Sequence, residues 1–70
     1  MSEIDAMKYA GEVLRKLIKD NYKSQEDFAF EFGTDIRNVS RWINNGINKV
    51  STLQELAERF NVLLKYFLPD

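Results

Sequence analysis

The chain contains no cysteine and no histidine, and these two absences exclude several kinds of site. Without cysteine there is no disulfide framework, no thiolate metal site and no thiol nucleophile. Without histidine a histidine-based catalytic triad is impossible and most zinc sites are excluded. No glycine-rich phosphate loop and no nucleophile–base pair occurs either. We therefore expect no enzymatic activity, no catalytic residues, no metal site and no cofactor.

Long apolar runs are also lacking. The longest has three residues, whereas a membrane-spanning helix needs about 20. The first five residues are acidic and lack the apolar segment of a secretory signal. These features predict a cytoplasmic protein without a membrane partner.

Glycine and proline are scarce, with three and one respectively, and they lie far apart. The length of 70 residues allows one domain, and 44% of the residues are apolar, which is enough for a small core. Apolar residues recur at helical spacing in five segments, so we predict a single all-α domain over residues 1–70. The expected helices are 4–21, 24–32, 35–44, 52–60 and 63–68.

Residue types that begin and end helices mark the second and third segments. The Ser24 hydroxyl can cap the amide of Asp27, and Gly33 can adopt the left-handed conformation that closes a helix. Thr34 or Asp35 is the expected N-cap of the third helix.

Two further expectations concern the first helix and the segment after the third. Gly11 lies inside the first helix, where glycine is unfavourable, which suggests a close helix crossing. Residues 47–50 are expected to form an exposed loop, and Ser51 or Thr52 to begin the fourth helix.

The spacing across the second and third helices is typical of two short helices that cross through a tight turn. With Gln25 as position one, Ala29 is fifth, Gly33 is ninth and Val39 is fifteenth. A small side chain fits where the helices approach, the turn requires a positive φ, and an apolar residue seats the second helix on the first.

Residues 11–68 resemble the helix-turn-helix domains of the lambda-repressor and Cro type, the XRE family. Residues 24–29, Ser-Gln-Glu-Asp-Phe-Ala, are similar to the family's Ser-Gln-Glu-Glu-Leu-Ala, and residues 39–44, Val-Ser-Arg-Trp-Ile-Asn, to its Val-Ser-Arg-Trp-Leu-Asn. The resemblance implies a five-helix fold with the helix-turn-helix at helices two and three. It also implies a prokaryotic or phage transcription regulator, a repressor, that binds specific double-stranded DNA with its third helix in the major groove.

The resemblance also assigns residues to DNA contacts. It implies base contacts from Ile36, Arg37 and Arg41 of the third helix and from Asn48 in the loop after it. Ser40 lies between the helix residues on the same face and is expected to contact bases as well. Gln25 and Asn44 match family residues that contact phosphate, and Lys23, Ser24 and Lys49 would add phosphate contacts by charge and at the amide end of the second helix. Independently, Arg37 and Arg41 are four residues apart, so they project from one helix face, and arginine is well shaped to bind guanine.

One such module makes few contacts, so the DNA partner is expected to be a pseudo-palindromic operator bound by a homodimer, or by the N-terminal domain of a larger regulator. The apolar residues of the C-terminal segment are the candidate dimer or docking surface: Leu63, Leu64, Phe67 and Leu68.

Other interpretations remain open. The same fold can serve as a protein-interaction module, such as an antirepressor, antitoxin or scaffold, without binding DNA. The acidic cluster Glu26, Asp27, Glu31 and Asp35 could suggest an acid–base pair or a metal site, but charges at helix starts account for it. Phe30 lies off the apolar face of its helix, so it is either a buried edge position or a partner contact.

The net charge of −1 is unevenly distributed. Residues 24–35 carry −4, whereas residues 36–54 carry +3 and contain no acid. The near-zero total therefore does not exclude DNA binding, and it predicts weak non-specific affinity with a modest salt dependence.

Overall fold

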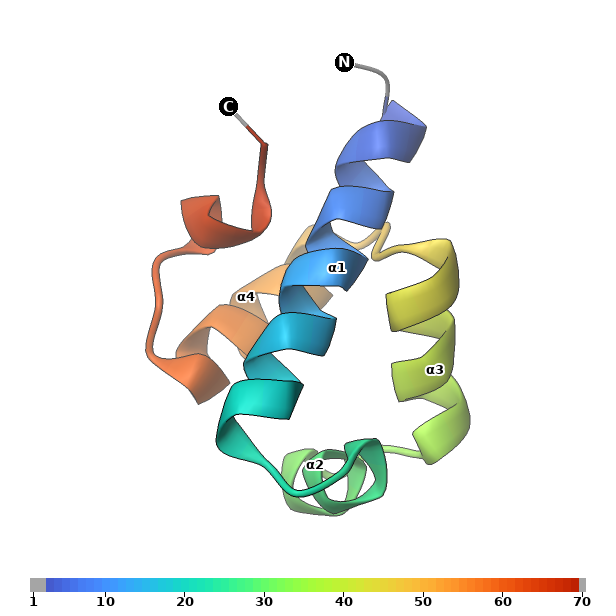
Figure 1. Cartoon of the computed structure of the whole chain (residues 1–70). Helices are drawn as coiled ribbons and strands as arrows, with labels where there is room; N and C mark the ends of the chain where they lie inside the picture. The colour runs from blue at the N-terminus through green and yellow to red at the C-terminus, as the bar shows by residue number, and fades with distance from the viewer. Residues whose placement is uncertain (1–2, 70) are drawn as a thin grey trace.

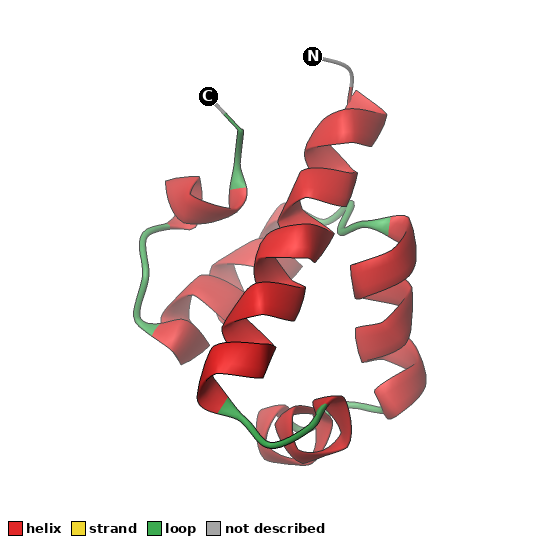
Figure 2. Ribbon diagram, in the orientation of Figure 1, coloured by secondary structure: helices red, strands yellow, loops and turns green. Residues whose placement is uncertain are grey.

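The computed structural model describes residues 3–69 and is all-helical over that range, as predicted (Figures 1 and 2). The elements are α1 (Glu3–Asn21), α2 (Gln25–Phe32), α3 (Ile36–Asn45), α4 (Val50–Phe60) and the 3-10 helix η1 (Leu64–Phe67). The fifth element is thus a short 3-10 helix and not an α-helix. No helix in the described part of the chain is both long and apolar enough to cross a membrane.

Helix α1 runs through the centre of the fold, with α3 on one side and η1 on the other (Figure 1). Helix α2 lies at the end where α1 finishes. Its inner face buries Ala10, Leu14 and Ile18. The remaining buried apolar residues come from every other element and from the loop after α3: Phe28, Ala29, Val39, Ile47, Leu53, Leu56, Ala57 and Phe67. Each of the five predicted segments therefore contributes at least one residue to the core.

An aromatic cluster fixes α2 against its neighbours. The Phe28 ring is stacked on Phe32 and on Phe60, with centroid distances of 5.3 and 5.4 Å, and meets Tyr22 edge-on at 5.2 Å. Phe32 in turn meets Trp42 of α3 edge-on at 6.0 Å. Ring contacts of this geometry stabilise beyond the area they bury, so the cluster holds α2 and α3 in a fixed relation.

The close crossing expected at Gly11 is confirmed. A Cβ atom at Gly11 would overlap the carbonyl oxygen of Trp42 and would lie 3.0 Å from that of Ile43. Both obstacles are backbone atoms of α3, so glycine is required where α1 and α3 meet.

The segment after α3 differs from the prediction. Ile47, expected in an exposed loop, is 3% exposed, and its backbone N–H donates to the Met7 carbonyl at 3.1 Å. Gly46 makes this approach possible, because its φ is 99° and a Cβ there would lie 2.7 Å from the Met7 backbone. The loop is therefore held against α1.

The predicted start of the fourth helix is also wrong. Helix α4 begins at Val50, and neither Ser51 nor Thr52 is its N-cap. The N-cap is Lys49, whose side chain makes no capping hydrogen bond. The buried Ile47 fixes the chain just before this point, so tertiary packing and not side-chain capping sets where α4 starts.

The C-terminal segment separates into inward and outward side chains. Phe67 is fully buried, and Leu64 is half-buried against the core. Leu63 and Leu68 are 67% and 42% exposed. Phe67 thus belongs to this chain's own core and not to a docking surface, because η1 turns its ring towards the helices.

Candidate nucleic-acid interface

Both ends of α2 are closed as the sequence predicts. The Ser24 hydroxyl oxygen accepts a hydrogen bond from the Asp27 backbone N–H at 3.1 Å. At the other end Gly33 has a φ of 86°, and its N–H donates to the Ala29 carbonyl at 3.0 Å. Residues 33–35 therefore form a short, defined turn between α2 and α3.

Of the two candidate caps for α3, Asp35 is the one used. Its carboxylate accepts from the Arg37 backbone N–H at 3.4 Å, whereas the Thr34 hydroxyl accepts from the Asn38 side chain at 3.0 Å. The same carboxylate lies 3.5 Å from the Arg37 guanidinium, and the two side chains are 53% and 85% exposed. Such an exposed ion pair is weak, so Arg37 is free to exchange this partner for another anion.

The outer face of α3 is polar and basic. Arg37, Ser40, Arg41 and Asn44 recur at the three- and four-residue spacing of one helix face, while Val39 on the inner face is fully buried. Both arginines are exposed. The Asn44 amide donates to the Ser40 hydroxyl at 3.2 Å, and α3 contains no acidic residue. The α3 face thus presents two guanidinium groups and polar groups on a rigid element.

Ile36, at the start of α3, lies in a hollow of about 550 Å³ with three of the predicted phosphate-contacting residues, Lys23, Ser24 and Gln25. Arg15 and Lys19 of α1 line the same hollow, as does one acid, Glu26. The structure therefore brings cations of α1 beside the amide end of α2 and the first residue of α3.

Arg15 and Lys19 were not predicted to belong to this site. A signal for them existed, because Arg15, Lys19 and Lys23 follow one another at four-residue intervals. In α1 that spacing places Arg15 and Lys19 on one helix face, and Lys23 follows in the turn that leads to α2.

The remaining predicted contacts lie elsewhere. Asn48 and Lys49 are exposed in the loop between α3 and α4, and neither lines the hollow. Among the acidic side chains of residues 5–69, which the structure describes, no group of three could hold a metal ion. The features that the α3 face and the hollow share are therefore exposed cations and amide or hydroxyl donors, which are groups that bind anions.

Comparison with known proteins agrees with this arrangement. A family model described as Helix-turn-helix matches residues 14–67, which include α2, α3, α4 and η1 in full. No curated protein and no solved structure matches the chain. Because the matched residues make up most of the chain, it belongs to the helix-turn-helix family of the lambda-repressor type, a family of DNA-binding transcription regulators.

Proposed function

We propose that the protein is a prokaryotic or phage repressor that binds specific double-stranded DNA, with α2 and α3 as the helix-turn-helix unit and α3 in the major groove. The observation that carries this proposal is the α3 face, which combines Arg37, Ser40 and Arg41 on a rigid helix without any acid. A helix of this width fits the major groove, where base edges are distinguishable.

Each part of the site has a distinct role in this proposal. Arg37 and Arg41 bind base edges, guanine O6 and N7 above all, while Ser40 and Ile36 contact neighbouring base edges. Phosphate contacts come from Lys23, Ser24, Gln25 and Asn44, with Lys49 after α3, and Arg15 and Lys19 extend this set along α1. Asn48 reaches a base from the loop.

Specificity in this proposal requires two copies. A single module buries only about 600–1,000 Å² on DNA, so a homodimer on a pseudo-palindromic operator, with half-sites about 34–36 Å apart, supplies the remaining contacts. Leu63 and Leu68 are the exposed apolar side chains of the C-terminal segment that are available for the dimer contact.

Removing either arginine is expected to abolish much of the sequence preference. For a site selected from a random DNA pool, Arg37→Ala and Arg41→Ala should each weaken binding by about five- to 150-fold, which corresponds to about 1–3 kcal/mol per bidentate contact. Fluorescence anisotropy against the selected site and a scrambled one measures the difference. Lys8→Ala, at an exposed position of α1, is the matched control and should change affinity less than two-fold.

If both arginine variants bound the selected site with unchanged affinity, α3 would not be the helix that recognises bases. Absence of DNA binding, or binding that salt does not weaken, would favour the protein-interaction module, because phosphate contacts release counterions.

Asp35→Asn is expected to tighten DNA binding without loss of stability. Asparagine caps a helix about as well as aspartate, so the free energy of unfolding should change by less than about 0.5 kcal/mol. The substitution removes the carboxylate that lies 3.5 Å from the Arg37 guanidinium. One negative charge fewer beside DNA should raise affinity about two- to five-fold. Anisotropy and thermal unfolding measure the two effects, and weaker binding would show that Asp35 positions Arg37 for contact.

A further inference from the structure

We infer that copies of this chain associate head to tail, with the outer face of α2 of one copy bound in the groove between α1 and the C-terminal segment of the next. The two surfaces lie on different elements and differ in charge. The inference does not use the α3 face, but the groove shares Arg15 and Lys19 with the proposed phosphate contacts and Leu63 and Leu68 with the proposed dimer contact.

The outer face of α2 carries an exposed aromatic ring among acids. Phe30 is 86% exposed, the highest value among the large apolar side chains that the structure describes, so its interpretation as a buried edge position is wrong. Glu26 and Asp27, four and three residues before Phe30, are exposed and share its helix face. The exposed Glu31 follows it, and α2 contains no lysine or arginine. The inner face already buries Phe28, so Phe30 has no place in this chain's core.

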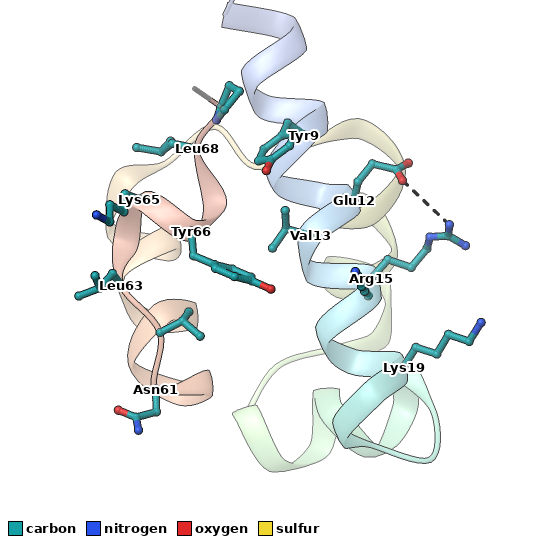
Figure 3. Close-up of a pocket in the computed structure, with 13 residues that line it drawn as sticks. Tyr9, Glu12, Val13, Arg15, Lys19, Asn61, Leu63, Lys65, Tyr66 and Leu68 are labelled. Carbon is teal, nitrogen blue, oxygen red and sulfur yellow. Dashed lines mark ion pairs between the residues drawn. The ribbon is translucent and has the colours of Figure 1, made fainter.

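The groove combines an apolar floor with basic edges. Figure 3 shows Tyr9, Val13 and Tyr66 turned towards the space between α1 and the C-terminal segment. Tyr9 and Tyr66 are 41% and 49% exposed, and the groove has a volume of about 1190 Å³. Aromatic rings that flank an open apolar floor can receive another aromatic ring.

Cations lie on both edges of this floor. Arg15 and Lys19 extend from the far side of α1 and Lys65 from the far side of the C-terminal segment, and Lys16 also lines the groove (Figure 3). Among the described residues that line the groove, the one acid is Glu12, which is ion-paired with Arg15 at 4.0 Å. The groove is therefore positive, and the α2 face is negative.

Charge decides which surfaces of two copies can meet. A symmetric contact of Phe30 on Phe30 would bring the same three acids of each copy together, which is unfavourable. Phe30 in the groove places an aromatic anchor on an apolar floor and sets the acids of α2 opposite Arg15, Lys16, Lys19 and Lys65. Because each copy keeps one surface free, the contact is heterologous and extends beyond two copies. One helix face buries little area, so association is weak and salt-sensitive.

Complementation between two variants tests the head-to-tail arrangement. Phe30→Gln removes the anchor, and Lys65→Glu with Tyr66→Ser removes one edge and part of the floor; neither Lys65 nor Tyr66 lines the hollow beside α2. In sedimentation equilibrium the wild-type chain should self-associate beyond a dimer at low salt. Each variant alone should associate at least about ten-fold more weakly, because truncation of an aromatic anchor has effects of this size. An equimolar mixture should recover one intact contact and stop at a 1:1 complex.

Val50→Gln is the matched control, since Val50 is 63% exposed and lies outside both surfaces. It should leave self-association unchanged, and circular dichroism should show all variants folded; Lys65→Glu alone replaces the double variant if that one unfolds. A monomeric wild-type chain at millimolar concentration would overturn the inference, as would unchanged association of Phe30→Gln. The inference would also be overturned if the equimolar mixture of the two variants associated no more strongly than each variant alone. Binding to a single operator half-site is measured separately with Phe30→Gln and should persist, so failure of this contact and failure of DNA binding are distinguishable.

Discussion

Gly11→Ala is expected to lower the free energy of unfolding by about 2–3 kcal/mol, because the added methyl group overlaps backbone and cannot be accommodated by a rotamer change. The obstacles are the carbonyl oxygens of Trp42 and Ile43, so α3 itself has to move away from α1. A single core in a chain of this length rarely supplies more than about 3–5 kcal/mol. The substitution should therefore lower the melting temperature by about 10–20 °C, as followed by far-UV circular dichroism.

The sign of this effect separates the contact from helix propensity. Alanine is favoured over glycine inside a helix by about 1 kcal/mol, so without the crossing Gly11→Ala would stabilise the protein. Gly33→Ala is the comparison, since a Cβ there meets nothing within 4 Å and only the φ of 86° opposes it. Its cost should be about 1–2 kcal/mol. An increase in stability of Gly11→Ala would contradict the close packing of α1 on α3.

Local chemistry explains why the sequence predicts the centre of the fold well. Ser24, Gly33 and Asp35 act through hydrogen bonds or a φ angle within a few residues, so their roles can be inferred without knowledge of distant contacts. The spacing of Arg37 and Arg41 likewise determines that both lie on one exposed face of α3. What that face contacts remains a prediction.

The features that were not predicted depend on residues far apart in the sequence. Ile47 is buried because its backbone binds Met7 of α1, about forty residues earlier. Arg15 and Lys19 join the hollow at the start of α3 only because α1 ends beside α2. Helix periodicity assigns a residue to a face, but it does not show which element will cover that face.

Phe67 is the residue for which the covering element matters most to stability, because its face was expected to meet a partner and is instead covered by the chain's own helices. Phe67→Ala is expected to lower the free energy of unfolding by about 3–5 kcal/mol, since a fully buried ring is lost and a cavity remains. An effect of that size is comparable with the whole stability of such a domain, so most molecules should be unfolded at 25 °C. Urea unfolding of a Phe67→Leu variant, which leaves a smaller cavity, measures the effect within the folded range and should show a smaller loss.

Leu63→Ala is the matched control within the same segment, because Leu63 is 67% exposed and its truncation opens no cavity. It should change stability by less than about 0.5 kcal/mol. If Phe67 were instead a docking residue, Phe67→Ala would leave the unfolding free energy of the monomer intact and impair only association. The two substitutions therefore distinguish two roles of the C-terminal segment, namely completing the core of this chain and only contacting a partner. The burial of Phe67 against α1 and α4 favours the first, with Leu63 and Leu68 left to make contacts outside the domain.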